Sequence, residues 1–145
     1  MAHRAAYLVV HDAGAAEDIA QEAFLAAIRS LDRFDRRRPF GPWLHRIVVN
    51  RAIDHARARA IRREVAVAEP VDVRADEEPA RLDGVVAALA ALPLDQRAVV
   101  VLRHLLGYTP GEIAALLDLP RGTVNSRLRR GLDALRGEVD AGRTA

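Results

Sequence analysis

Four polar side chains near the C-terminal end of the sequence have the types and spacing needed to read DNA. Arginine can donate two hydrogen bonds to a guanine edge or a phosphate, asparagine can read adenine, and serine suits either group. Positions three and four residues apart share one side of a helix. The set consists of Asn125, Ser126, Arg129 and Arg130. We expect this side of a helix to face a nucleic acid.

Two helices joined by a short turn must position these side chains. Thr109 and Glu112 form a Thr-x-x-Glu capping box with Pro110 at the first helical position, so a helix begins near Thr109. Residues 118–122 contain proline and glycine and interrupt the apolar period as a turn does. The next helix has an apolar side at spacings of four, four and three, formed by Val124, Leu128, Leu132 and Leu135.

This pattern predicts a helix-turn-helix, the arrangement that lays one helix in the DNA major groove. The competing interpretation is a solvated arginine-rich helix, because charged runs on helices usually meet only water. The capped preceding helix and the short turn favour DNA binding.

The charge distribution also suits a polyanionic partner. The 145-residue chain has 22 basic residues, all of them arginine, and 20 acidic residues, for a formal net charge of +2. The net charge is +5 over residues 1–63, −6 over residues 64–95 and +3 over residues 96–145. Two basic parts therefore flank an acidic segment, as expected for two small domains that meet nucleic acid.

Catalysis and metal binding find no support in the sequence. It contains no cysteine, which excludes disulfides, thiolate metal sites and cysteine catalysis. The five histidines lack metal-ligand spacing, and there is no glycine-rich phosphate loop or nucleophile beside a base. We expect no enzymatic activity, no cofactor and no metal. Without a membrane-length apolar run or a signal peptide, we expect no membrane insertion and a cytoplasmic location.

Helical periodicity predominates, so the sequence predicts an all-α fold of two small helical domains. The first domain spans residues 1–63 and the second, with the helix-turn-helix, spans residues 82–137. Residues 64–81 mix acids, prolines and short apolar residues without helical period, which indicates a flexible acidic linker. Residues 138–145 form a tail.

Individual helices follow from the same periodicity. In the first domain we expect a helix through His11, a break at residues 12–14, and a helix from about Ala15 to Leu31. A long helix then begins near Pro39 or Gly41. In the second domain we expect helices near residues 82–91 and 94–106, separated by Pro93 and ended by Gly107.

The second helix of the first domain presents an acidic side. Its expected buried stripe comprises Ile19, Ala20, Ala23, Phe24, Ala27, Ile28 and Leu31. The helix dipole accounts for acids in the first turn, which covers Glu17 and Asp18. It does not account for Gln21 and Glu22. A docking face for a basic protein surface explains all four.

The long third helix combines aromatic and basic residues. We expect Trp43, Leu44, Ile47 and Val48 to point inward with Phe40 packed nearby, and two polar stripes to carry Arg46, Asn50 and Arg57, and Arg51, His55 and Arg59. Such a helix can stack unpaired bases and follow a phosphate backbone. Simple core packing is the competing interpretation for Phe40 and Trp43.

The motifs of both domains resemble one known family. Residues 16–24 (AEDIAQEAF), with Leu31-Asp-Arg-Phe34, Pro39-Phe40, Trp43-Leu44-x-Arg46-Ile47 and Asn50-x-x-x-Asp54, resemble region 2 of bacterial sigma factors of the extracytoplasmic-function (ECF) group in the sigma-70 family. Residues 92–97 (LPLDQR), Val101-Leu-Arg103, Gly107-Tyr, Glu112-Ile-Ala and Gly122-Thr-Val-x-Ser-Arg127 resemble region 4 of the same group. The two motif sets occur in the family's order and flank the acidic segment.

The resemblance implies a promoter-specificity subunit that binds core RNA polymerase and promoter DNA, with an anti-sigma factor as a further expected partner. The segment that docks on the polymerase matches Glu17, Asp18, Gln21, Glu22 and Phe24. The segment that meets the −10 element matches residues 33–50, and our candidates there are Phe40, Arg46, Asn50 and Arg51. The −35 reader matches Asn125, Ser126, Arg129 and Arg130, with Arg121 and the N–H groups around Gly122 and Thr123 on a phosphate.

One departure from the family pattern bears on the first domain. Family members carry an upstream segment before the position of Met1, so we expect part of region 2 to be absent and its packing weakened. Two alternatives to a sigma factor stay open. One is a stand-alone helix-turn-helix regulator, which leaves the first-domain motifs unexplained. The other is a sigma fragment that titrates an anti-sigma factor, which the shorter first domain allows.

Overall fold

The computed structural model describes residues 2–65 and 80–144, with side chains at residues 2–62 and 84–141. All regular elements in these ranges are helices, so the predicted all-α fold class is confirmed. The chain divides into two compact units, Met1–Val67 and Ala68–Ala145. Each unit is described by itself.

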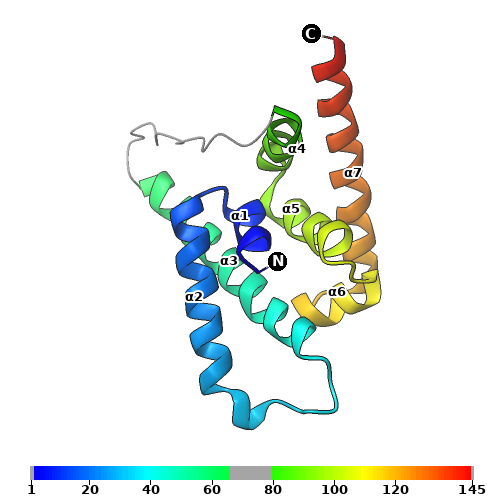
Figure 1. Cartoon of the computed structure of the whole chain (residues 1–145). Coiled ribbons are helices and arrows are strands. Elements are labelled where there is room, and N and C mark those ends of the chain that lie inside the picture. The colour runs from blue at the N-terminus through cyan, green and yellow to red at the C-terminus, as the bar shows by residue number, and fades with distance from the viewer. Residues whose placement is uncertain (1, 66–79, 145) are drawn as a thin grey trace. The chain divides into compact units, whose positions relative to one another are not determined.

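The first unit is a bundle of three helices. It contains α1 (Ala2–Val10), α2 (Ala13–Arg29), the short 3₁₀ helix η1 (Leu31–Arg33) and α3 (Phe40–Val65). Each of the three α-helices packs against the other two (Figure 1). A loop of residues 34–39 connects η1 to α3.

The reversal between α1 and α2 is tighter than predicted. His11 has a positive φ of 53°, and its N–H donates to the Tyr7 carbonyl at 2.7 Å. Asp12 then caps α2, because its Oδ1 accepts from the Ala15 N–H at 3.0 Å. The predicted break at residues 12–14 is wrong in extent, since Gly14 already lies inside α2.

Small residues form the buried side of α2. Four of its five buried residues are alanines, and Ile19 is the only larger one. The prediction that Phe24, Ile28 and Leu31 are buried is wrong: their exposed fractions are 48%, 63% and 49%. Alanines let neighbouring helices approach closely, which leaves no interior room for the larger side chains. The interior partners on α3 are Leu44, Val48, Val49, Ala52 and Ile53.

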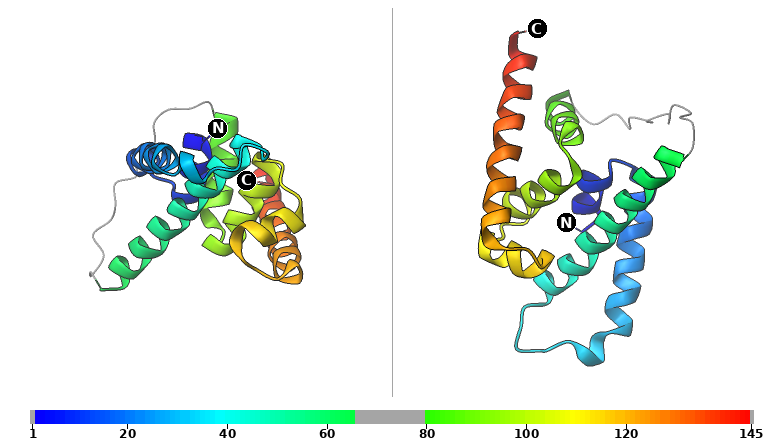
Figure 2. Two further views of the ribbon diagram at one scale, coloured as in Figure 1. Left: turned by 90° about the horizontal axis from the view of Figure 1, so that it is seen from below. Right: turned by 180° about the vertical axis from the view of Figure 1, so that it is seen from behind.

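The second unit is built around its longest helix. It contains α4 (Ala80–Ala91), α5 (Leu94–Val100), the π-helical turn η2 (Val101–Leu105), α6 (Pro110–Leu117) and α7 (Arg121–Thr144). The helices α4, α5 and α6 all pack against α7 (Figures 1 and 2). Its core includes Val99, Leu102, Ile113 and Val124, all fully buried.

The helix-turn-helix begins as predicted and has a shorter turn. The Thr109 hydroxyl accepts from the Glu112 N–H at 3.2 Å, and the Thr109 N–H donates to the Glu112 carboxylate at 3.0 Å. This reciprocal pair confirms the capping box. Asp118 takes the left-handed conformation with a φ of 55° and ends α6. Only residues 118–120 form the turn, since Arg121 and Gly122 belong to α7.

The predicted linker and tail are partly helical. At its two ends the linker assigned to residues 64–81 is helical, because α3 continues to Val65 and α4 begins at Ala80. The remainder, residues 66–79, lies outside the described residues. The helix α7 continues through residues 138–144, which we assigned to a tail.

Arg97 secures the junction between α4 and α5. Its Nε donates to the Leu89 carbonyl at 3.0 Å, and its Nη2 donates to the carbonyls of Leu92 at 2.9 Å and Ala90 at 3.3 Å. These carbonyls lie at the end of α4 and on the residue that follows it, where backbone acceptors lack helical partners. Burial lowers the pKa of the Arg97 guanidinium, which still stays charged.

We expect Arg97→Met to lower the free energy of unfolding of the chain by about 1–3 kcal/mol, because carbonyls shielded from water lose their donors. Urea unfolding monitored by circular dichroism measures this change. Arg136→Met on the exposed side of α7 is the control and should change stability by less than about 0.5 kcal/mol. Equal effects of the two substitutions would contradict the role assigned to Arg97.

The capping box predicts a pH-dependent contribution to stability. Hydrogen bonds to Thr109 lower the pKa of the Glu112 carboxyl. The larger contribution comes from the Thr109 N–H and the smaller one from the Thr109 hydroxyl. Its stabilisation is therefore complete above its unfolded pKa of about 4.3 and is lost as the pH falls through the lower folded pKa. Glu112→Gln should flatten the decline in unfolding free energy between neutral pH and about pH 3. Glu138→Gln, an exposed change on α7, should leave the wild-type profile intact.

Candidate nucleic-acid and partner interfaces

The outer side of α7 has the arrangement predicted for a DNA reader. Asn125, Arg129 and Arg130 are exposed, while Ser126 is half-buried. On the opposite side of the helix Val124 is fully buried and Leu128 is 8% exposed. No hydrogen bond or ion pair joins the three exposed side chains to other described residues. Their donors and acceptors are thus available to a partner.

Contacts on the flanks of α7 hold this helix in place. Leu132 and Leu135 continue the inner side and are half-buried. Arg127 Nη1 lies 4.0 Å from the Asp95 carboxylate at the start of α5. The sequence predicted the apolar contacts, but it did not distinguish Arg127, which binds within the unit, from Arg129 and Arg130, which do not.

The N-terminus of α7 differs from the prediction in one respect. The Arg121 side chain is exposed, as a phosphate ligand must be. However, the Thr123 N–H donates to the Pro120 carbonyl at 3.0 Å, and the Val124 N–H donates to the same oxygen at 3.2 Å. The Thr123 amide is therefore already engaged within the protein, which the sequence did not indicate, and its contact with a phosphate stays a prediction.

Three aromatic rings gather where the loop of residues 34–39 joins α3. Phe34 lies 4.8 Å from Trp43 and 5.8 Å from Phe40 between ring centroids, and Phe40 lies 5.7 Å from Trp43. Phe40 is 44% exposed, whereas Phe34 and Trp43 are half-buried. The cluster is therefore neither a closed core nor a set of isolated surface rings. It presents stacking surface at the molecular boundary.

An arginine-rich turn lies between Phe34 and Phe40 in the chain and so connects two rings of this cluster. Asp35 organises the turn, because its carbonyl accepts from the Arg38 N–H at 2.9 Å and its carboxylate accepts from the Arg37 N–H at 3.0 Å. The side chains of Arg36, Arg37 and Arg38 are all exposed. Sequence reasoning placed this loop within residues 33–50, the segment that matches the −10 region, but named none of its three arginines as a candidate ligand. The run of three arginines directly before Pro39-Phe40 was the signal that could have identified it.

The structure separates Arg51 from the other predicted −10 residues. Arg46 is exposed and Asn50, one turn further along α3, is half-buried. Arg51 Nη1 instead lies 3.5 Å from the Glu22 carboxylate of α2. Arg59 likewise pairs with Asp12 at 3.4 Å. The stripe predicted to follow a phosphate backbone thus faces α2 and its cap at these two residues. Arg51 is 42% exposed beside its carboxylate partner and stays a predicted DNA ligand.

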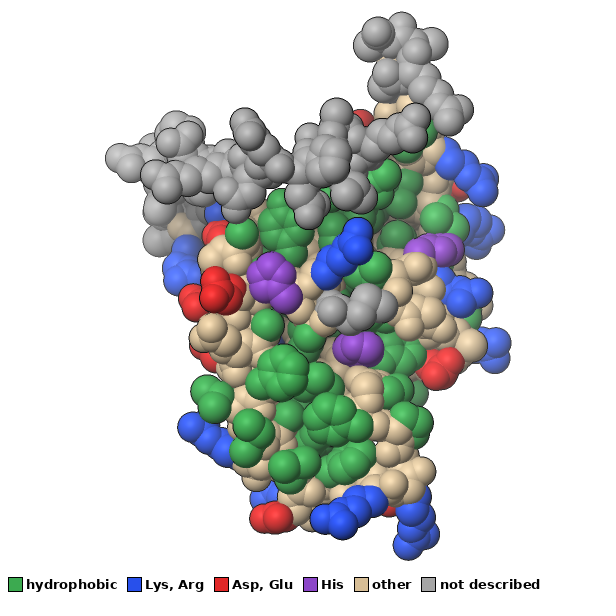
Figure 3. All heavy atoms as spheres, in the orientation of Figure 1, with side chains coloured by type: hydrophobic (Ala, Val, Ile, Leu, Met, Phe, Trp, Pro, Cys, Tyr) green, Lys and Arg blue, Asp and Glu red, His purple; other side chains and the backbone are tan. Residues whose placement is uncertain are grey.

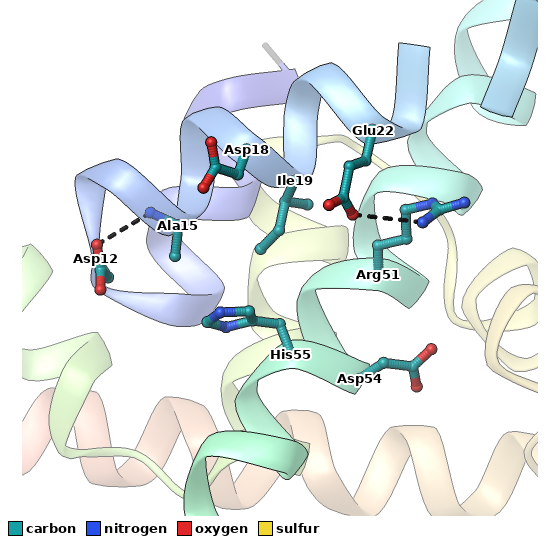
Figure 4. A pocket seen from close by; sticks show the side chains of 8 residues that line it. All are labelled: Asp12, Ala15, Asp18, Ile19, Glu22, Arg51, Asp54 and His55. Carbon is teal, nitrogen blue, oxygen red and sulfur yellow. Dashed lines mark hydrogen bonds and ion pairs between the residues drawn. The ribbon is translucent and has the colours of Figure 1, made fainter. Parts of the chain in front are cut away.

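An open pocket of about 550 Å³ lies between α2 and α3. Figure 4 shows Arg51, Asp54 and His55 of α3 opposite residues of α2 and its cap. The other lining residues are Asp12, Ala15, Asp18, Ile19 and Glu22. Acidic side chains outnumber basic ones on its wall, and two of the four acids, Asp12 and Glu22, already pair with arginines of α3.

The outer side of α2 combines acids with large apolar residues. Glu17, Asp18, Gln21 and Glu22 are exposed, as predicted. One to two turns further along, Phe24 is joined by Leu25 and Ile28, which are 52% and 63% exposed. Figure 3 shows hydrophobic side chains gathered over this end of the unit. Sequence reasoning missed Leu25 and Ile28 as surface residues, because Ile28 also fits the helical period of the buried side.

The described part of the chain contains neither a candidate metal cluster nor a candidate membrane-spanning helix. Within the described residues no three histidine or acidic side chains come together in a way that could hold a metal ion. None of the helices in that part is both long and apolar enough to cross a membrane.

Comparison with known proteins agrees with the division into two units. The family model for Sigma-70 region 2 matches residues 1–61, and that for Sigma-70, region 4 matches residues 82–135. The chain is 34% identical to the ECF RNA polymerase sigma factor SigW of Bacillus subtilis, over 92% of this chain and 80% of SigW.

Two solved structures are similar to the chain along most of its length. The sigma factor RpoE of Bartonella quintana, in complex with the anti-sigma factor NepR, matches with a TM-score of 0.79 and 24% identity, covering 96% of this chain and 89% of RpoE. CnrH, in complex with the cytosolic domain of CnrY, matches with a TM-score of 0.69 and 32% identity, covering 97% of this chain and 80% of CnrH.

Proposed function

The chain belongs to the ECF group of RNA polymerase sigma factors, and we propose that its two units divide promoter recognition between the −10 and −35 elements. The single observation that supports this division most is the two-sided α7. One side is buried against its own unit and the other presents exposed Asn125, Arg129 and Arg130. In this proposal the chain acts by binding and performs no chemistry itself.

The helix α7 reads the −35 element from the major groove. Arg129 and Arg130 have the reach for bidentate contacts to guanine or phosphate, and Asn125 suits adenine. Arg121 at the start of the helix meets the DNA backbone and sets the register. The exposed surface of these residues and their lack of partners among the described residues support this assignment.

The aromatic cluster and the neighbouring turn meet the −10 element. Unstacking a base costs a few kcal/mol, so the protein must offer a stacking surface and cationic flanks in return. Phe40 supplies exposed ring surface, and Arg36 and Arg38 stand on the turn beside it. Arg46 and Asn50 extend the same region along α3 with hydrogen-bonding groups.

The outer side of α2 docks on the polymerase. Its acidic half, with Glu17, Asp18 and Gln21, suits a basic partner surface, and its apolar half offers Leu25 and Ile28 for burial. The Glu22–Arg51 pair borders this side and fixes one carboxylate in the pocket wall. An interface of this kind has an apolar centre and a charged rim.

We extend the proposal to an anti-sigma partner and a cytoplasmic place of action. RpoE, which shares this fold, was solved with an anti-sigma factor. A partner that covers the apolar half of α2 would compete with the polymerase for the same side chains. Polymerase and promoter DNA are found in the cytoplasm, which is where the chain must then act.

Reconstitution with core RNA polymerase tests the function. The full chain is mixed with core enzyme and a library of promoters, and the transcripts are sequenced. We expect transcripts whose templates share a −35 and a −10 element. Failure to bind core enzyme would overturn the proposal. Binding without initiation would point to a titrating fragment, and DNA binding without polymerase would point to a stand-alone regulator.

Arg129→Ala tests base reading by α7. We expect it to relax selection at one −35 position, at a cost of about 1–3 kcal/mol for the preferred base. Competition between promoters that differ at single −35 positions measures the change. Arg136→Ala, exposed two turns further along the same helix, should change nothing. Uniform weakening across all −35 sequences would assign Arg129 to a phosphate instead.

Ile28→Ser tests polymerase docking by α2. We expect the affinity for core polymerase to fall by about fivefold or more, because burying an isoleucine side chain contributes about 1.5–3 kcal/mol relative to leaving it exposed. Ile61→Ser provides a matched control, since Ile61 of α3 is also 63% exposed. Equal affinities of the two variants in a fluorescence binding assay would exclude Ile28 from the interface.

A further inference from the structure

Gly131 lies at a close contact between α7 and α5. A Cβ atom at this position would stand 2.8 Å from Val100 Cγ2, 3.6 Å from Gln96 Cβ and 3.7 Å from the Gln96 carbonyl oxygen. Carbon atoms of separate side chains in van der Waals contact do not approach to 2.8 Å. Any side chain at residue 131 must therefore push the two helices apart or displace Val100.

Val100 has little freedom to move aside. It is 4% exposed and lies in a buried run with Val99, Val101 and Leu102. A β-branched side chain has restricted χ1 rotamers, and a close-packed interior offers no space for a shifted methyl group. The displacement would then fall on α7. To reach the 3.4 Å at which ordinary contact begins, the two atoms must separate by about 0.6 Å.

Helix propensity alone disfavours glycine at this position. Alanine is the better helix former, because glycine loses more backbone freedom on folding. The same helix contains Gly137, where a Cβ would meet nothing within 4 Å. Only Gly131, among the glycines of α7 whose side-chain environment the structure describes, allows another helix to come this close.

The contact lies directly behind the DNA-facing side chains. Gly131 is on the inner side of α7, adjacent in sequence to Arg130 and two residues after Arg129. A recognition constellation must be held within about 0.5 Å of its productive geometry. A shift of 0.6 Å at residue 131 is of that size.

We propose that Gly131 is a positioning residue for −35 recognition: its missing side chain seats α7 on Val100 of α5 and thereby aims Arg129 and Arg130 at the DNA. This inference rests on the proposed role of α7 in reading the −35 element. It adds a residue that never touches DNA to those that determine base discrimination.

The test compares discrimination with stability in four variants of the full chain. Gly131→Ala, Val100→Ala, the double variant and Gly137→Ala are each assembled with core polymerase. A promoter obtained from the library selection and its single-base −35 variants are the probes. The measured quantity is the ratio of transcription between the preferred and altered −35 sequences at saturating holoenzyme, together with the melting temperature of each chain.

We expect Gly131→Ala to reduce the discrimination ratio by about fivefold or more, the amount lost with one good base contact. The double variant should regain most of the ratio, because Val100→Ala removes the methyl group that the new Cβ would meet. Gly137→Ala should keep the ratio and raise the melting temperature. A purely structural role would lower the melting temperature of Gly131→Ala and leave the ratio unchanged.

Several results would overturn the inference. One is a folded Gly131→Ala variant with the wild-type ratio. Another is a double variant that fails to regain the ratio, or that fails to fold although Val100→Ala alone does fold. If Gly131→Ala does not fold, the discrimination ratio of the double variant decides. A ratio near that of the wild type supports the inference, and a reduced ratio overturns it. Failure of the proposed function is distinguishable, because wild-type protein would then show no −35 discrimination at all.

Discussion

The packing of α7 against α5 and α6 is the contact on which the proposed DNA-reading surface of the second unit depends. Val124 and Leu128 bury one side of α7, and Gly131 lets the helix approach Val100 of α5. A helix held this closely on one side projects the opposite side in a defined direction. The arginines on that side can then serve as a preformed reading surface, with less ordering left to occur on binding.

The first unit meets a different constraint, which is that its helices pack through small residues. Alanines dominate the buried side of α2, so the helices approach closely and the interior accommodates few large side chains. The bulkier Phe24, Leu25 and Ile28 remain exposed for that reason. A small domain that leaves this much apolar surface outside gains stability when a partner covers it. Partner binding and stability of the first unit are therefore connected.

Local chemistry was predictable where neighbours in sequence are also neighbours in space. The capping box at Thr109, the helical nature of both units and the two-sided pattern of α7 all followed from spacing. The environments of Ile28 and Arg51 did not follow from spacing. Ile28 fits the helical period of the buried side but is exposed, and Arg51 fits a basic stripe but pairs with Glu22. The environment of each residue depends on the distance between α2 and its neighbouring helices. The periodicity of the sequence carries no information about that distance.

The sequence by itself determined the helices, the two motif sets and hence the family, because capping, period and residue type are local properties of the chain. Only the tertiary structure decided which arginines are committed inside a unit and which remain available. It also decided that Phe34 joins Phe40 and Trp43, and that residue 131 has no room for a methyl group. These are distances between elements, and they depend on the packing of side chains that lie far apart in the sequence.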